Sequence, residues 1–514
     1  MYFISTRGGE KVTGAQAIVQ GLAKNGGLFV PETFPTVTKE ELQAMTEMDY
    51  PQRAAFVLGK YLADDLGAEY LQEACEKAYA TFTGNDPAPL VKIDGKMFIL
   101  ELFHGPTCAF KDMALTVLPY LLKKSCEVTG IKDDILILAA TSGDTGKAAL
   151  EGFRDVAGTK VAVFYPDEGV AKMQRLQMCI QDGDNVFVAA VKGNFDDCQR
   201  AVKRLFASED FNAELAKKNV RLSSANSINF GRLAPQIAYY FSSYLDLLTS
   251  NQIEMGDEID FVVPTGNFGD ILAGWYAKQM GLPIRKLVCA SNRNKVLADF
   301  FAKGVYDVKR HFFRTMSPSM DILVSSNLER LLFEISGRDA KLTASRMQSL
   351  QNNKEYSITQ AEKAILDKEF FGGFASEDDT VEAMYEVFDE YGYAMDTHTG
   401  VALAVYNQYR DTLEKKDEEI VDQTPVVVLS TANPYKFPQD VLYALSGNDV
   451  KDSFKGIKRL NLLTAMKPPK CLLDLRYRPL RFKTVVNNDL GEMASEIMKF
   501  ADGYIVPVPD GGKK

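Results

Sequence analysis

From about residue 95 onward, the chain repeats one pattern: a short apolar run, a turn that contains glycine, and an amphipathic segment. This pattern is typical of βαβ units, in which helices cover both faces of a parallel sheet. Strands buried on both faces are apolar throughout, as ILILAA at 135–140 and VFVAAV at 186–191 are. Further strands are predicted at 160–165, 221–224, 259–263, 287–290 and 426–429. The chain is therefore predicted to be an α/β protein.

Residues 10–80 have a different character. They alternate Ala- and Leu-rich helical patterns with one Gly- and Pro-rich break at 25–31, and they contain little that is typical of a strand. We predict a small, mainly helical region at the N-terminus.

Composition argues against several functional classes. The formal charge of −10 disfavours nucleic acid as a partner, and no apolar run approaches the ~18 residues of a membrane span. The seven cysteines form no CxxC pair, which favours reduced thiols and disfavours structural zinc. The three histidines form no HExxH, and no serine lies in GxSxG. We expect an unprocessed cytoplasmic protein with no membrane, nucleic-acid or metal ligand.

Ligands of such sheets bind where strands end and helices begin. The first of these turns, TSGDTG at 141–146, combines two glycines with the hydroxyls of Ser142 and Thr145. It is not a Walker A loop, since Thr141 replaces the first glycine and Ala148 replaces the magnesium-binding Ser or Thr. It is either a cradle for a carboxylate or phosphate, or an ordinary turn whose Ser or Asp caps the helix.

Two other turns have similar features. PTGNFGD at 264–270 fails the GxGxxG test for a dinucleotide, but its backbone amides suit a single phosphate. NSINFGR at 226–232 brings two amides, a hydroxyl and the guanidinium of Arg232 together. Each alone is equally an ordinary turn, and a lone arginine is more often a surface residue. Three such turns on one sheet favour anion binding.

Lys111 lies in HGPTCAFKD at 104–112, among aromatic and small residues. Partial burial there would lower the pKa of its amine and make it a nucleophile or a base. Most lysines, however, are solvated surface residues. His104 is interpreted as a packing or hydrogen-bonding residue.

In combination these motifs resemble the threonine synthases, pyridoxal-phosphate (PLP) enzymes of the tryptophan-synthase-β-like fold. The resemblance covers most of the chain and rests on nine segments: STRG at 5–8, 26–31, HGPT…AFKD, TSGDTG, NSIN..R, GNFGD, MSPSMD at 316–321, HTG at 398–400 and STA at 430–432. It implies fold type II, with two open, mostly parallel sheets flanked by helices. We expect a helical region at 1–90, a smaller α/β domain at 91–250, a larger cofactor domain at 251–445, and a C-terminal extension at 446–514 packed on the larger domain.

The resemblance also implies a role for each site residue. Lys111 would bind the cofactor covalently, Thr431 would approach the pyridine nitrogen, and Asp144 would lie near the cofactor O3′, where many relatives of this fold carry Asn. The remaining residues would bind anions: the cofactor phosphate at Gly266, Asn267, Phe268, Gly269 and Asp270, the substrate carboxylate at Ser142, Gly143 and Thr145, and the substrate phosphate at Ser227, Asn229 and Arg232.

The reaction implied is a β,γ-replacement that converts O-phospho-L-homoserine and water to L-threonine and phosphate, with Lys111 as the proton carrier and a monomeric or homodimeric enzyme. A related phospho-lyase that releases 2-oxobutanoate, and a non-catalytic relative that keeps the fold, are the alternatives. Three residues depart from the family pattern, namely Thr397, Asn433 and Tyr435.

Overall fold

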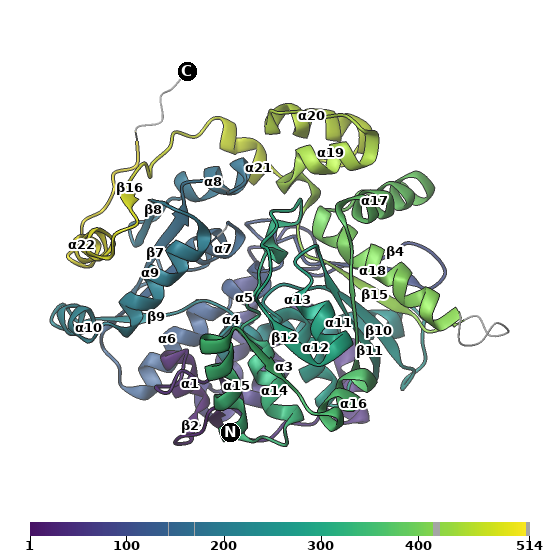
Figure 1. Cartoon of the computed structure of the whole chain (residues 1–514), viewed down its shortest axis with the longest axis horizontal. Coiled ribbons are helices and arrows are strands. Elements are labelled where there is room, and N and C mark those ends of the chain that lie inside the picture. Colours follow the sequence, from purple (N-terminus) through teal and green to yellow (C-terminus); the bar gives the residue numbers. More distant parts are fainter. Residues whose placement is uncertain (142, 169, 415–421, 510–514) are drawn as a thin grey trace.

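Two sheets form the centre of the molecule (Figure 1). The computed structural model describes residues 1–141, 143–168, 170–414 and 422–509. The larger sheet has the order β14 (Phe370–Phe374), β11 (Ile284–Ser291), β10 (Ile259–Pro264), β15 (Val426–Ser430), β5 (Met97–Glu101) and β4 (Leu90–Lys92). All neighbouring pairs in it are parallel except β4 with β5.

The smaller sheet is parallel throughout. Its order is β16 (Val485–Asn487), β8 (Val186–Lys192), β7 (Thr159–Pro166), β6 (Asp134–Ala140) and β9 (Val220–Ser223). All seven strands predicted from the apolar runs are present at the expected places, so the α/β fold with two mostly parallel sheets is confirmed.

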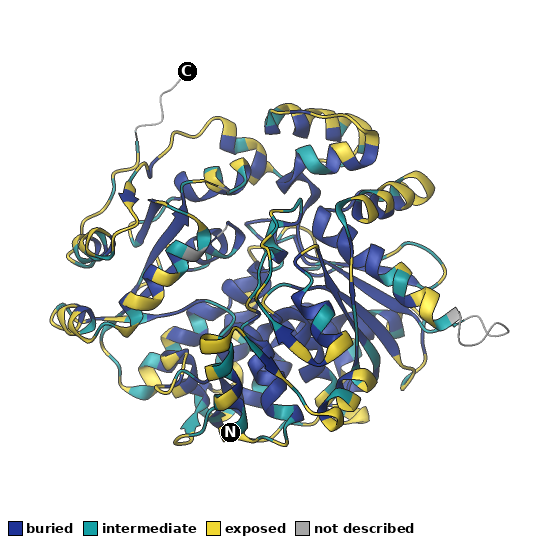
Figure 2. Ribbon diagram, in the orientation of Figure 1, coloured by how far each residue is buried: buried dark blue, intermediate teal, exposed yellow. Residues whose placement is uncertain are grey.

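Alternate residues of one strand enter two different cores, because successive side chains point to opposite faces of a sheet. In β15, Val427 and Leu429 pack with α11 (Phe230–Thr249) and α12 (Gly269–Gln279), whereas Val426 and Val428 pack with α18 (Thr397–Glu414). Both faces of the larger sheet are therefore covered at its centre, where every residue of β10 and β15 is buried (Figure 2).

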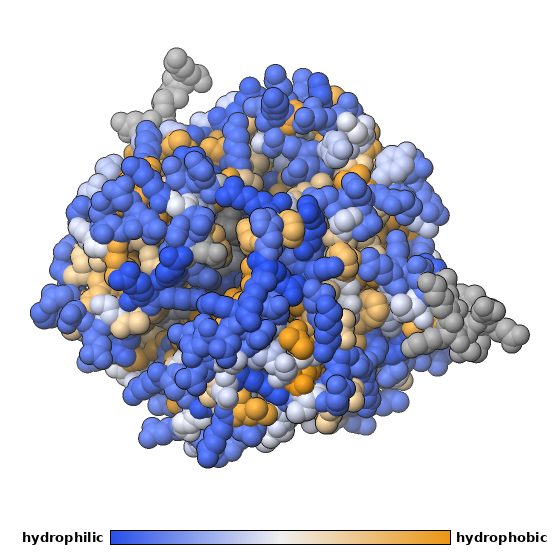
Figure 3. All heavy atoms as spheres, in the orientation of Figure 1, coloured by the Kyte–Doolittle hydropathy of each residue, from blue (hydrophilic) through white to orange (hydrophobic). Residues whose placement is uncertain are grey.

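Helices on the smaller sheet include α7 (Asp144–Gly152), α8 (Lys172–Cys179) and α9 (Phe195–Ala207). The remaining elements after residue 100 are α5 (Asp112–Leu115), α6 (Leu118–Thr129), α10 (Glu209–Ala216), α13 (Val296–Lys303), β12 (Val305–Asp307), α14 (Leu328–Ile335), α15 (Ala340–Asn353), β13 (Glu355–Ser357), α16 (Gln360–Glu369), α17 (Glu377–Tyr391), α19 (Pro438–Ser446), α20 (Ser453–Thr464), α21 (Lys470–Leu473) and α22 (Leu490–Ala501). The face drawn in Figure 3 is mostly hydrophilic. Across the described ranges, no helix combines the length and apolarity that crossing a membrane requires.

The N-terminal region contains the expected helices, namely α1 (Gly14–Gln20), α2 (Lys39–Ala44), α3 (Tyr50–Leu66) and α4 (Ala68–Tyr79). It also contains a small antiparallel sheet of β1 (Tyr2–Ser5), β2 (Val12–Thr13) and β3 (Phe29–Pro31). These strands are too short to show an alternating pattern, and for this reason the sequence did not predict them.

The sheets differ from the expected domain boundaries in two places. β5 falls in the segment assigned to the smaller domain, but it pairs with β15 of the larger sheet. β16 falls in the extension assigned to the larger domain, yet it pairs with β8 of the smaller sheet (Figure 1). A strand joins whichever sheet edge its backbone reaches, and position in the sequence does not determine that edge.

Candidate active site

A cavity of about 260 Å³ lies where the strand-to-helix turns of both sheets meet. Its lining includes most of the residues singled out in the sequence: Lys111, Asp144, Thr145, Ser227, Arg232, Gly266, Asn267, Phe268, Gly269, Asp270 and Thr431. The strand-end turns predicted from the sequence therefore meet at one cavity, which is the candidate site.

Lys111 is held at the end of the larger sheet. Phe110 N donates a hydrogen bond to Thr431 O at 2.8 Å, and Ala109 forms a bridge with Ala432, so the lysine turn is attached to the end of β15. Burial, with the nearby charges of Arg232 and Lys436, lowers the pKa of Lys111 to about 8, although Asp144 opposes the shift. About a tenth of the amine is thus neutral and nucleophilic at pH 7, far more than for a lysine with an ordinary pKa.

The turn at 264–270 is shaped for a phosphate. Phe268, the residue that precedes α12, has a φ of +63° and makes no side-chain hydrogen bond to the helix, so the first backbone amides of α12 lie at the cavity without a side-chain cap. A Cβ atom at Gly266 would lie 2.8 Å from Ser319 O, and one at Gly269 would lie 3.1 Å from Ser227 Cβ. A side chain at position 266 would therefore force the backbone to shift, whereas one at position 269 would require a smaller movement of Ser227.

Asp270 belongs to the same turn, but its carboxylate is held by α11. Tyr239 and Tyr240 both donate hydrogen bonds to Asp270 Oδ1, whereas Oδ2 is buried without a partner among the described residues. Burial raises the pKa of Asp270 to about 6 despite these hydrogen bonds.

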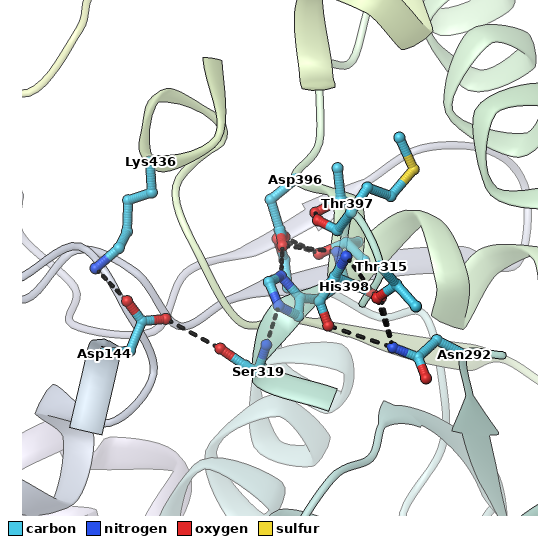
Figure 4. Close-up of polar contacts among 12 residues, drawn as sticks. Asp144, Asn292, Thr315, Ser319, Asp396, Thr397, His398 and Lys436 are labelled. Atoms are coloured by element: carbon cyan, nitrogen blue, oxygen red, sulfur yellow. Dashed lines mark hydrogen bonds and ion pairs between the residues drawn. The ribbon is translucent and has the colours of Figure 1, made fainter. Parts of the chain in front are cut away.

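Asp144, the first residue of α7, is the centre of a polar network (Figure 4). Lys436 Nζ lies 2.8 Å from Oδ1, Gln174 Nε2 donates to Oδ1 at 2.9 Å, and Ser319 Oγ donates to Oδ2 at 3.3 Å. Burial opposes ionisation, yet the charges of Lys436 and Lys111 hold the pKa of Asp144 well below its usual range. Sequence reasoning missed Lys436, although it closely follows the end of β15.

His398, also at the cavity, was named only as part of a motif. Its Nε2 accepts a hydrogen bond from Ser319 N at 3.1 Å, and its Nδ1 lies 2.7 Å from Asp396 Oδ1 (Figure 4). Because Nε2 acts as the acceptor, the ring proton is on Nδ1 and is donated to Asp396. The imidazole thus positions the segment that contains Ser319.

Arg232 is a buried cation on the cavity wall. The one hydrogen bond that its guanidinium makes in the described chain is from Nη1 to Ala225 O at 2.8 Å, and no described carboxylate forms an ion pair with it. Burial lowers its pKa to about 10, so it remains charged at neutral pH. A buried guanidinium without a counter-ion at a cavity favours an anionic ligand.

Two predicted substrate contacts, Asn229 and Gly143, are not among the residues that line the cavity. Asn229 caps α11 by accepting from Gly231 N, and it donates to Ile18 O, so its amide is used within the fold. Gly143 N donates to Thr141 Oγ1 at 2.9 Å, and a Cβ atom on Gly143 would lie 2.4 Å from Gln174. Ser142 lies outside the described residues.

A nucleophilic amine and an uncapped glycine turn that line one cavity fit pyridoxal phosphate, which is bound through both its aldehyde and its phosphate. The fold and the site define a PLP-dependent α/β enzyme, and a family model described as pyridoxal-phosphate dependent enzyme matches residues 82–431. Two further models match on either side: threonine synthase N terminus over residues 2–79, and threonine synthase, C-terminal over residues 399–497. The chain belongs to the threonine synthase family.

Individual relatives agree with this assignment. Threonine synthase from Pseudomonas aeruginosa is 38% identical over 442 residues, which cover 86% of this chain and 90% of the relative. Human threonine synthase-like 1 is also 38% identical, over 85% of this chain, but the match spans only 59% of the longer relative. The crystal structure of PLP-bound threonine synthase from Brucella melitensis superimposes with a TM-score of 0.85 at 35% identity, covering 98% of this chain and 99% of that one.

Proposed function

We propose that the protein converts O-phospho-L-homoserine and water to L-threonine and phosphate. The observation that carries this proposal is Arg232, a buried cation that has no carboxylate partner among the described residues and lines the same cavity as the turn at 264–270. The cofactor brings one phosphate and the substrate brings another, so two phosphate positions are required in one cavity. The threonine synthases of similar sequence and structure support the same reaction.

Bound PLP withdraws electrons from the amino acid attached to it and so makes the Cα proton acidic. Lys111 Nζ, neutral above about pH 8, is the base at this cavity that accepts a proton and later returns it. Arg232 donates to the substrate phosphate and stabilises the charge that develops as this group leaves from Cγ. The Thr145 hydroxyl at the start of α7 is left for the substrate carboxylate, the role that the family resemblance gives it.

When the phosphate leaves, the bond between Cγ and the ester oxygen breaks and its electron pair goes with the phosphate. Water supplies the hydroxyl that forms the new Cβ–O bond. Protons must be removed from Cα and Cβ and added at Cγ and Cα. We assign several of these transfers to Lys111, because neighbouring cations hold Asp144 ionised and Asp270 is fixed through its Oδ1 by Tyr239 and Tyr240.

The test is product analysis with purified holoenzyme and O-phospho-L-homoserine, using chromatography for amino and keto acids and a separate phosphate assay. We expect L-threonine and phosphate in equal amounts. Formation of 2-oxobutanoate and ammonia without threonine would instead identify a phospho-lyase. A protein that binds no PLP under any condition of reconstitution would have to be a non-catalytic relative.

A further inference from the structure

Asp144 and Lys436 form a fully buried ion pair beside the active-site amine. The exposed fractions of their side chains are 2% and 0%, and the atoms Oδ1 and Nζ are 2.8 Å apart. Lys436 also donates to Thr107 O at 2.8 Å, so its position is fixed from two sides. It does not line the cavity, whereas Asp144 does. Lys436 therefore influences a ligand through its contact with Asp144 and through its own charge, and not by touching it.

The pair has an electrostatic consequence when the cofactor is bound. Asp144 has two cationic neighbours, Lys436 at 2.8 Å and Lys111 at 3.8 Å. When PLP is covalently attached to Lys111, this side chain no longer carries a free ammonium group. Lys436 is then the permanent counter-ion of Asp144. A buried carboxylate without a counter-ion takes up a proton.

Other charged or titratable groups face this pair from the surrounding turns. They are Asp112 and Cys108 on the lysine turn, Cys471 of α21, and Arg232 and Asp270 across the cavity. The Asp112 carboxylate accepts hydrogen bonds from Thr107 N and Oγ1 at 2.7 and 2.6 Å, and Cys108 Sγ lies 3.2 Å from Cys471 Sγ. None of these groups contacts Asp144 directly within the described residues.

We propose that Lys436 is a positioning residue that keeps Asp144 ionised and thereby sets the pH at which the nitrogen joining Lys111 to the cofactor is protonated. The carboxylate favours the protonated nitrogen through its negative charge. Lys436, by its own charge, opposes protonation of that nitrogen, so its two effects have opposite signs. The direction in which the pH midpoint shifts when Lys436 is replaced therefore depends on whether Asp144 is present. This dependence makes the proposal testable.

The experiment measures the pH midpoint of the visible cofactor band in holoenzyme without substrate. In the wild-type background, Lys436→Met should lower the midpoint by about one unit, a tenfold loss of proton affinity, because Asp144 becomes neutral. In the Asp144→Asn background the same substitution should raise the midpoint, because only a repelling cation is removed. If Lys436 acted only through its own charge, Lys436→Met would raise the midpoint in both backgrounds. That result, or no shift in either background, would overturn the proposal.

Three controls complete the design. Lys436→Arg keeps the charge and should retain the wild-type midpoint. Lys147→Met removes a different buried lysine, which belongs to α7. Lys147 Nζ lies 2.8 Å from the Glu151 carboxylate and does not line the cavity, so its loss should alter stability without moving the midpoint. Lys436→Gln provides the same test if the Met variant does not fold. The proposal rests on the family's cofactor, and since no substrate is used, its failure is distinguishable from failure of the proposed reaction.

Discussion

Lys111 Nζ lies 3.8 Å from Asp144 Oδ2, close enough for electrostatic attraction but too far for a hydrogen bond. No described residue accepts a hydrogen bond from this amine, although it lies 4.4 Å from the centre of the Phe110 ring. Lys436 takes the closer position at Asp144 instead. The site thus holds an amine that is oriented by charge and ring contact and whose lone pair remains available for chemistry.

The rate constant with which the apoenzyme binds PLP should depend on pH, with a midpoint at the pKa of Lys111. The neutral amine is the nucleophile, and burial lowers its pKa to about 8. The rate constant should therefore rise as the pH approaches about 8 and level off above it. Stopped-flow absorbance of the growing visible band measures this dependence. A rate constant that climbs tenfold per pH unit to beyond about 10, as for an ordinary lysine, would contradict the lowered pKa.

Lys111→Ala should lower kcat by more than about 10³-fold, because both the covalent attachment and the proton carrier are lost. Its melting temperature without cofactor should not fall, since burial already disfavours the charged amine. Borohydride reduction followed by peptide mapping should place the cofactor on Lys111 in the wild type and on no residue in the variant. Lys147→Ala is the control, and it should keep the cofactor label.

Arg232→Ala should lower kcat/KM for O-phospho-L-homoserine by about 30-fold or more while PLP stays bound, because a buried counter-charge for the substrate phosphate is removed. Arg221→Ala is a matched control. Its guanidinium lies on the neighbouring β9, is 55% exposed and pairs with Asp133, so its loss should change kcat/KM little. Equal kinetics for both variants would mean that the substrate phosphate is bound elsewhere.

Gly266→Ala should weaken PLP binding by about 1–3 kcal/mol, since the new Cβ atom would lie 2.8 Å from Ser319 O and force the phosphate turn or its neighbour to move. Equilibrium titration of the visible band measures the change in Kd. Gly95→Ala, whose Cβ atom meets nothing within 4 Å, is the control for a tolerated substitution. Unchanged affinity in Gly266→Ala would remove this turn from the cofactor site.

Asn229→Ala separates a structural role from substrate binding. The substitution removes the cap of α11 and the hydrogen bond to Ile18 O, which should reduce the free energy of unfolding by about 1–2 kcal/mol. KM for the phosphorylated substrate should stay near the wild-type value, because the side chain does not reach the cavity. Urea denaturation and steady-state kinetics together give the answer, and a large rise in KM with normal stability would restore the substrate-binding role.

Local sequence patterns predicted the features that depend on neighbouring residues. The apolar runs at 135–140, 259–263 and 426–429 became β6, β10 and β15, and the turns after β6 and β10 line the cavity. A buried parallel strand needs apolar side chains on both faces, and a ligand at its end needs a glycine-containing turn. Both features can therefore be recognised from a few consecutive residues. The aromatic and small residues next to Lys111 in the sequence likewise singled it out as a candidate for a lowered pKa.

Only the tertiary structure decided which distant residues meet. It placed β5 in the larger sheet and β16 in the smaller one, used Asn229 as a helix cap, and brought Lys436 to Asp144 and His398 to Ser319. A buried charge is stabilised when an opposite charge lies within a few ångströms, and that distance is set by how strands cross and turns converge. The sequence by itself thus determined the fold class and the turns and, through the family resemblance, singled out Lys111, whereas three-dimensional packing determined the charges that surround them.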